Sequence, residues 1–472
     1  MTTEASSAFP LFSFDTDNLH TLQEDVPTDL QFLRLRLRFG LPERVQVGQQ
    51  FRLVVDLVDE MGQPVPEDLA PPDGIDICIA SQRSTHVDNV KTHSVKEEDQ
   101  LILKIEEKLA PKSTTQQQTK WVYGASLQAS AKDHCSSRPF SDNHVSLLIQ
   151  MKQTIGSCDG SSSSGGYRNL LQTFCARSAW LSDRVLVLPL QVELQVSTVT
   201  QGRHRVAMST SCQRLFRTVN TSVDRANDTH DLVVVEENYG DAMGSHVWDA
   251  SILLSFAVIQ AGIPALNFPQ QEEEEETTRK SETKEAILEL GSGCGLFAAV
   301  LAKLAFSREA VMRIFTEKSD CTERLQANLD RNESASSTLV LPLEWGAALP
   351  ILLYTAGVRV VFAADVLYNW AAHEAFLATL DSLAQQKQSL LVFLAHKRRG
   401  KASATRLDAL ASGTFDPATL CGAATAPPAC RWSHWHVEKL SALGRVDFFR
   451  LSYARKVLNP ADVHCRRAEN CS

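Results

Sequence analysis

The sequence predicts an α/β protein in two parts: a C-terminal doubly wound, mainly parallel sheet and an N-terminal β-rich, sandwich-like domain. Short strand patterns fill the first third of the chain, and from about residue 230 strand and helix patterns alternate. Such alternation is typical of βαβ units. A glycine-rich turn also joins the strand expected at residues 286–290 to the helix expected at residues 296–304. Sheets of this kind bind ligands at the carboxyl ends of their strands.

The N-terminal strands are predicted by side chains that alternate between apolar and polar. Residues 32–39 alternate apolar side chains with Arg34, Arg36 and Arg38, which we interpret as the solvated face of a half-buried strand. Several short strands separated by turns indicate a sandwich or small barrel. The further strands are expected at residues 51–58, 75–79, 101–105, 121–127 and 145–151.

The C-terminal elements are predicted in an alternating order. Strands are expected at residues 232–235, 286–290, 311–315, 339–343, 358–363, 390–395 and 446–452. Helices are expected at residues 248–259, 296–304, 321–331 and 371–383.

Composition places the domain boundaries. Residues 156–166 are a Gly/Ser-rich loop, and strand character returns at residues 185–196. We therefore expect a β-rich module at residues 1–155, a flexible loop with a connecting strand region at 156–205, the α/β domain at 206–460 and a tail at 461–472. A chain of 472 residues fits two or three domains.

Charge and cysteine content narrow the class of protein. The net charge of −9 argues against bulk nucleic-acid binding, which needs an extended basic face. The 11 cysteines show no small-domain framework, and the first residues lack the pattern of a secretory signal. We expect a reducing intracellular location in the cytoplasm, with the nucleus left open. The basic cluster at residues 397–401 is interpreted as a solvated loop.

One uncharged segment is long enough to cross a bilayer. Residues 250–269 carry no charge, but polar side chains interrupt the segment and prolines stand near its end. We expect a buried helix followed by a loop, and no membrane span.

The glycine turn predicts a ligand site. Glycines at 291, 293 and 295 remove side chains, so backbone N–H groups can meet a ligand at the start of a helix. Leu296 stands where the third glycine of the dinucleotide fingerprint would fall. Glu289, two residues before the first glycine, suits a ligand with an ammonium group. S-adenosylmethionine is such a ligand.

Polar residues follow the neighbouring strands. Glu317 ends the second strand, where a carboxylate can accept hydrogen bonds from ribose hydroxyls. Trp345 follows the third strand and either stacks on an adenine or packs in the core. Asp365 and Tyr368 follow the fourth, where they would hold an amine beside the methyl group to be transferred.

These motifs resemble the seven-β-strand protein methyltransferases of methyltransferase family 16, a group of mainly lysine methyltransferases. Residues 365–368 (D-V-L-Y) are similar to its D-x-x-Y signature, and residues 247–250 (V-W-D-A) to its W-D-A-A element. Residues 289–295 match its first motif, and residues 343–345 (L-E-W) resemble its L-D-W element. The resemblance covers residues 230 to 456 and implies a seven-stranded, Rossmann-like class I methyltransferase domain.

The resemblance also implies the site residues. The S-adenosylmethionine site would be lined by Trp248, Glu289, Gly291, Gly293, Gly295, Glu317, Trp345 and Ala364. Asp365 and Tyr368 would be the catalytic pair that positions the substrate amine. Glu317 and Glu344 stand where the family usually has Asp, which lengthens each side chain by one methylene.

The sequence therefore predicts an S-adenosylmethionine-dependent methyltransferase that acts on a lysine side chain of a protein. The N-terminal module would recognise that substrate or a partner protein. Methylation of histidine or of a small amine stays open, as does a catalytically silent scaffold. Cys421, Cys430, His434 and His436 match no standard zinc spacing, so no metal is expected.

Overall fold

The structure is a computed structural model. It describes residues 16–42, 44–65, 69, 75–80, 101–107, 120–129, 143–151, 166–175, 179–182, 184–197, 208–209, 211–218, 232–238, 243–261, 285–304, 311–332, 338–369, 372–386, 389–399 and 435–454.

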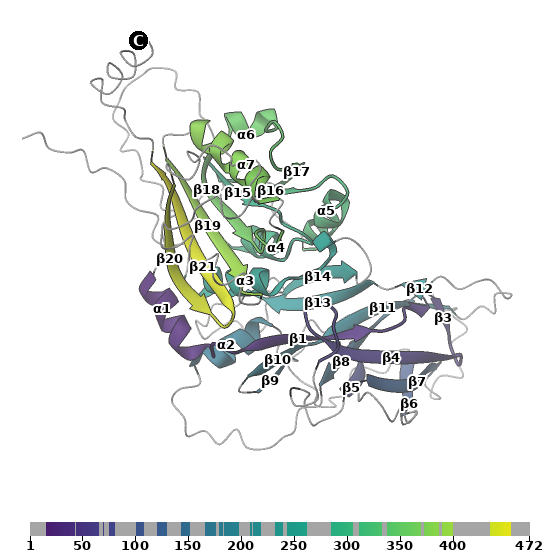
Figure 1. Cartoon of the computed structure of the whole chain (residues 1–472). Helices are drawn as coiled ribbons and strands as arrows, with labels where there is room; N and C mark the ends of the chain where they lie inside the picture. The colour runs from purple at the N-terminus through teal and green to yellow at the C-terminus, as the bar shows by residue number, and fades with distance from the viewer. Residues whose placement is uncertain are drawn as a thin grey trace, which may run out of the picture.

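The N-terminal part is a β-sandwich of two sheets (Figure 1). The first sheet has the order β6 (Leu101–Glu107), β7 (Lys120–Ala129), β4 (Gln50–Val58), β1 (Gln31–Leu37), β10 (Val185–Leu188) and β9 (Trp180–Leu181). The second has the order β14 (Leu232–Asn238), β13 (Ser211–Arg217), β11 (Leu190–Ser197), β8 (Asn143–Met151) and β5 (Ile75–Ala80). β3 (Arg44–Gln46) pairs with β11, and β2 (Leu41–Pro42) pairs with β12 (Met208–Ser209).

Alternation along the strands builds the sandwich core. Leu35 and Leu53 from the first sheet meet Leu147 and Leu190 from the second in one buried cluster. Side chains two positions apart share a face of a strand, so the apolar half of each pattern turns inward.

The expected boundary near residue 205 is wrong for this sandwich. β13 continues the second sheet from β11, and β14 pairs with β13 in the register Leu215↔Val234. Residues 232–235 were expected in the α/β domain. Their antiparallel pairing places them at the edge of the sandwich instead, because pairing partners rather than strand patterns decide sheet membership.

The C-terminal part is a seven-stranded sheet. Its order is β17 (Thr338–Pro342), β16 (Met312–Glu317), β15 (Glu285–Leu290), β18 (Gly357–Ala364), β19 (Ser389–Lys397), β21 (Val446–Ala454) and β20 (Trp435–Leu443). The first five strands are parallel, and β21 runs antiparallel to both of its neighbours.

Helices cover both faces of this sheet, as the alternating pattern predicts. One face packs against α3 (Asp249–Ala261), α4 (Leu296–Lys303) and α5 (Thr322–Arg331). The other packs against α6 (Ile351–Thr355) and α7 (His373–Gln386). The uncharged segment after residue 249 therefore begins as a buried helix, and no described helix is both long and apolar enough to span a bilayer.

β20 and α1 are among the elements that were not anticipated in the sequence. β20 forms a hairpin with β21 through Gly444, whose φ of +56° favours glycine. α1 (Thr16–Asp25) packs on β20 and α3, with Leu19 and Leu22 buried. The hydroxyl of Ser441 donates to Oε1 of Gln23 over 2.8 Å. The first described helix therefore closes on the last hairpin (Figure 1).

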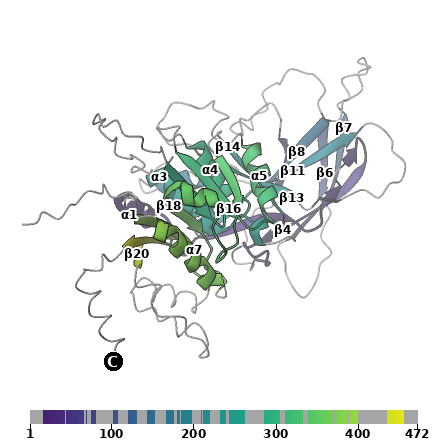
Figure 2. The same ribbon diagram turned by 90° about the horizontal axis from the view of Figure 1, so that it is seen from above.

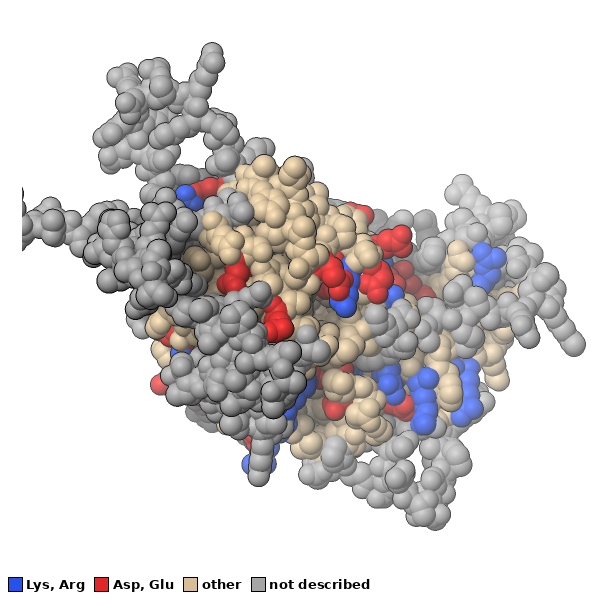
Figure 3. All heavy atoms as spheres, turned by 45° about the horizontal axis from the view of Figure 1, so that its top comes forward, with Lys and Arg blue, Asp and Glu red and all other residues tan. Residues whose placement is uncertain are grey.

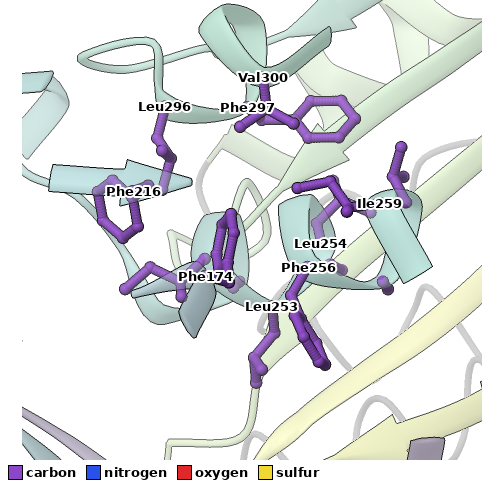
Figure 4. Packing of buried hydrophobic residues seen from close by; sticks show 14 of the residues in the cluster. Phe174, Phe216, Leu253, Leu254, Phe256, Ile259, Leu296, Phe297 and Val300 are labelled. Atoms are coloured by element: carbon purple, nitrogen blue, oxygen red, sulfur yellow. The ribbon is translucent and has the colours of Figure 1, made fainter. Parts of the chain in front are cut away.

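The two parts share one hydrophobic core. α4 and α5 contact β14 at the edge of the sandwich, and α2 contacts β13; Figure 2 shows α4, α5 and β14 from above. Phe216 of β13 and Phe174 of α2 (Gly166–Phe174) lie 5.5 Å apart between ring centroids, and Phe174 lies 5.9 Å from Phe256 of α3. Figure 4 shows these rings beside Leu296 and Phe297 of α4. The sandwich is therefore part of the same folding unit as the α/β domain.

Phe216→Ala tests the shared core. Phe216 is fully buried, so its removal leaves a cavity and lowers the free energy of unfolding by about 3–5 kcal/mol. In urea titrations, far-UV circular dichroism and tryptophan fluorescence should shift together in one transition. Two separate transitions, with only one displaced by the substitution, would show that the modules fold independently.

Candidate functional site

The glycine turn lies at the carboxyl end of β15, between β16 and β18. Gly291, Gly293 and Gly295 all have positive φ, at 71°, 56° and 87°. A Cβ on Gly291 would lie 3.1 Å from Trp345 Cζ2 and 3.1 Å from Val366 Cγ1. A Cβ on Gly295 would lie 2.5 Å from Leu325 Cδ1. Glycine is required here by conformation and by space.

Glu289 is a buried carboxylate beside this turn. Its side chain is 1% exposed, and its Oε2 has no hydrogen-bond partner among the described residues. Burial raises the pKa of Glu289 to about 8, so the group is largely protonated at neutral pH. A buried acid without a cation is costly in its charged form, and a ligand ammonium would relieve that cost.

Glu317 ends β16 and is tied to the glycine turn. The backbone N–H of Gly293 donates to its Oε2 over 2.7 Å, and the N–H of Lys318 donates to Oε1 over 2.9 Å. Burial raises the pKa of Glu317. The longer arm of glutamate reaches the turn, while Glu344 is exposed on the surface.

Trp345 is a packing residue that also borders the turn. It is half-buried, and its ring meets the ring of Phe376 edge-on at 5.2 Å between centroids. Its Cζ2 atom limits the space above Gly291. Both roles expected for this tryptophan, core packing and a place beside the ligand, are compatible with this geometry.

A pocket lies over the turn, with a volume of about 270 Å³ that includes open solvent. Five of the expected residues line it: Trp248, Glu289, Gly291, Gly293 and Ala364. Gly295, Glu317, Trp345, Asp365 and Tyr368 are not among its lining residues. His246 and Ser251 line the pocket as well, although the sequence patterns did not point to them.

Trp248 precedes α3 and stands at the edge of the pocket. Its indole N–H donates to the Met243 carbonyl over 3.1 Å. The Arg399 guanidinium lies 5.4 Å from the centre of its ring, within cation–π range.

Asp365 is buried and already paired. Nη1 of Arg399 donates to its Oδ1 over 2.7 Å, Nη2 of Arg399 contacts Oδ2, and His396 Nδ1 lies 3.1 Å from Oδ1. Burial alone would raise the pKa of Asp365, but the hydrogen bonds from Arg399 and the nearby His396 ring lower it to about 2. Its φ of 59° marks a tight turn after β18.

Tyr368 is half-exposed at 47% and lies three residues beyond Asp365. Burial raises its pKa, and the nearby charges of Glu317 and Asp365 add to the rise. An exposed phenol thus follows the buried carboxylate of Asp365 by three residues.

Two sequence interpretations of basic residues are wrong. Arg34 is 1% exposed and bonded to Asp249, so it does not belong to a solvated strand face. Lys397, the last residue of β19, and Arg399 are paired with buried carboxylates, so these two residues do not belong to a solvated loop. Alternation along one strand cannot reveal that a second module covers its polar face.

Of the four residues considered for a zinc site, only His436 lies among the described residues. Cys421, Cys430 and His434 lie outside the described residues. Within the described ranges, no group of three or more His, Cys, Asp or Glu side chains is arranged to hold a metal ion.

The residues of this pocket fit S-adenosylmethionine. The free Oε2 of the buried Glu289 carboxyl suits the ammonium group of this ligand, and the side-chain-free turn suits close approach of its methionine part. Glu317 has the acceptor oxygens that ribose hydroxyls need.

Residues 226–412 match the model of the family described as lysine methyltransferase, methyltransferase family 16. The resemblance inferred from the motifs is confirmed over this segment. The chain thus contains an S-adenosylmethionine-dependent methyltransferase domain, with the cofactor that the glycine turn predicted. No curated protein matches the chain.

Solved methyltransferase structures are similar to part of the chain. The mitomycin 7-O-methyltransferase MmcR is 17% identical, with a TM-score of 0.27, and the match covers 37% of this chain and 51% of that one. A SAM-dependent methyltransferase from Aquifex aeolicus is 16% identical, with a TM-score of 0.24, and the match covers 36% of this chain and 83% of that one. The chain spans about half the length of the mitomycin enzyme.

Glu289 gives the site a testable pH dependence. Because its pKa is raised to about 8 in the free protein and a bound ammonium favours the charged form, binding should release a proton. The affinity for S-adenosylhomocysteine should therefore rise with pH between about 6 and 7.5, by up to about tenfold per unit. Calorimetry in buffers of different ionisation enthalpy measures this release. Glu289→Gln should bind S-adenosylhomocysteine weakly and with an affinity that does not change with pH. An equal pH dependence in that variant would show that Glu289 is not the group that releases the proton.

Gly291→Ala tests the turn. The added methyl would crowd Trp345 and Val366, and the left-handed backbone would cost about 1–2 kcal/mol. S-adenosylhomocysteine binding should fall sharply in calorimetry. Gly48→Ala is the matched control, because its φ is also positive but no atom lies within 4 Å of the place that a Cβ would take. Equal loss of binding in both variants would show that the effect is general instability.

Proposed function

We propose that this protein is an S-adenosylmethionine-dependent protein N-methyltransferase whose acceptor is a lysine side chain. The observation that carries the proposal is the buried carboxyl group of Glu289, whose Oε2 has no hydrogen-bond partner among the described residues, beside a glycine turn that lacks side chains. The family description, lysine methyltransferase, supports the choice of acceptor.

The acceptor would enter past Tyr368 toward Asp365. Tyr368 is accessible from solvent, whereas Asp365 is 4% exposed. The phenol can accept a hydrogen bond from an amine or donate one to it. The Asp365 carboxylate, three residues earlier in the chain, is held in a fixed orientation by its pair with Arg399.

The cofactor, when bound, supplies a methyl group on a positively charged sulfur. The acceptor nitrogen must be neutral, because its lone pair forms the new bond to carbon as the carbon–sulfur bond breaks and its electrons return to sulfur. A lysine ammonium therefore loses a proton to water before transfer, and a desolvated site lowers its pKa. The residues of the chain contribute mainly positioning.

A second candidate acceptor is the imidazole of histidine. Asp365 is already neutralised by Arg399, so no spare negative charge stands ready for an ammonium. A histidine side chain can be uncharged near neutral pH, which suits a site where the negative charge of Asp365 is already paired with Arg399.

The face of the molecule shown in Figure 3 carries charges of both signs. In the coloured part of Figure 3, acidic and basic side chains lie near one another among uncharged ones. A role for the sandwich in recognising the substrate, and a cytoplasmic location, stay proposals.

Labelling of a cell extract tests the function. Extract from cells that lack this protein is incubated with tritiated S-adenosylmethionine and either wild type or Asp365→Asn. The wild type should label a protein band on lysine, and the variant should label it about a hundredfold less, because the acceptor is misplaced. Affinity for S-adenosylhomocysteine should be alike in both.

The outcomes separate the candidates. If the acid hydrolysate contains labelled methylhistidine and no labelled methyllysine, the acceptor is histidine, the second candidate. No label together with no heat from S-adenosylhomocysteine would leave only a silent scaffold.

A further inference from the structure

Side chains of the sandwich hold the segment that borders the cofactor pocket. Oε2 of Glu237 accepts from the Val247 N–H over 3.1 Å, and Arg34 donates to the Val247 carbonyl over 2.7 Å. Arg34 also donates to Oδ1 of Asp249 over 2.6 Å. Trp248 lies between these two anchored residues, so its position depends on the N-terminal part of the chain.

Glu60 of the sandwich contacts three residues of the α/β part: Asp249, Lys397 and Arg399. It follows β4, is 4% exposed, and its Oε2 accepts from the Asp249 N–H over 3.3 Å. Its Oε1 accepts from Lys397 Nζ over 2.8 Å and from Arg399 Nε over 3.1 Å. One carboxylate of the sandwich therefore touches both the start of α3 and the segment after β19.

Arg399 bridges this carboxylate to the acceptor side. One guanidinium contacts Glu60 and makes a two-pronged pair with Asp365, while its face lies over Trp248. A planar guanidinium with several donors in fixed directions can hold two carboxylates at once. The orientation of Asp365 is thereby coupled to a residue about 300 positions earlier in the chain.

The charges of this group balance. Three carboxylates (Glu60, Asp249 and Asp365) face three cations (Arg34, Lys397 and Arg399). Loss of Glu60 would leave Arg399 drawn to Asp365 alone and Lys397 drawn to Asp249 alone. The guanidinium would then move toward the acceptor position and away from the sandwich.

We propose that Glu60 of the N-terminal sandwich is a positioning residue of the methyl-transfer site, acting through Arg399 on Asp365. The inference rests on the proposed function, because it assigns Asp365 to the acceptor. It makes the sandwich part of the acceptor site, in addition to any recognition role. Glu60 itself touches neither the cofactor pocket nor Tyr368 among the contacts described.

The test compares Glu60→Gln, Arg399→Gln and the double variant in the full chain. A dilution series of the extract, with tritiated S-adenosylmethionine, measures label incorporated per enzyme at each acceptor concentration. Each single variant should label about tenfold less or worse, and the double variant should equal Arg399→Gln alone. Affinity for S-adenosylhomocysteine should stay within about threefold of wild type, because Arg34 and Glu237 still hold residues 247 and 249.

Ser441→Ala is the matched control. It removes a hydrogen bond between the N-terminal helix and the last hairpin without touching the charge group. It should label like wild type. If Glu60→Gln labels like Ser441→Ala, or if the losses of the two single variants multiply, Glu60 does not act through Arg399 and the proposal is overturned.

A second variant covers the case in which Glu60→Gln does not fold. Arg399→Lys keeps the charge at a partly exposed position but cannot bridge two carboxylates in the same geometry. It should bind S-adenosylhomocysteine and label about tenfold less. Full labelling by this variant would overturn the proposal. If the wild type neither binds S-adenosylhomocysteine nor labels any band, the proposed function itself is wrong.

Discussion

The placement of the two parts of this molecule depends on one buried carboxylate, Asp249. A buried charge costs several kcal/mol unless it is paired, and the partners of Asp249 come from both ends of the chain: Arg34 from β1 and Lys397 from the end of β19. Burial alone would raise the pKa of Asp249, but Lys397 and Arg34 hold it below its usual value. An ion pair of this kind adds less to stability than to the uniqueness of the fold, because any other placement of the sandwich would separate buried Arg34 from Asp249. The start of α3, the edge of the cofactor pocket and the surroundings of Arg399 all follow from that placement.

The sequence predicted the C-terminal sheet well for a physical reason. Parallel strands buried on both faces read as short apolar runs, such as residues 286–290 and 358–363, and the helices between them show a longer period. The glycine turn and the residues that follow each strand could be placed from order alone, because parallel strands bring their carboxyl ends to one edge. β20 was missed because its mixed pattern of residues 435–443 is that of an edge strand with one face half exposed.

The sequence did not predict how the site is completed. Glu60 and Arg34 lie hundreds of residues from Arg399, and no local pattern distinguishes a charge on a solvated strand from one that a second module will cover. The same limit affected the domain boundary, since β14 has the composition of either sheet and only its pairing with β13 decides. Asp365 was placed correctly after β18, but its pairing with Arg399 and His396 depends on tertiary structure. The sequence therefore predicted which polar residues follow each strand, but it did not predict the ion pairs between residues far apart in the chain.

The closure of α1 on the final hairpin has a consequence for biosynthesis. Gln23 and Ser441 are separated by 418 positions, so α1 cannot pack on β20 until that strand has left the ribosome. At about 5–20 residues per second, that interval lasts roughly 20–80 seconds. During it, the apolar face of a nascent helix and the edge of an incomplete sheet are exposed together. Translation speed and the access of chaperones to the emerging N-terminus should therefore influence how much of this protein reaches its native state.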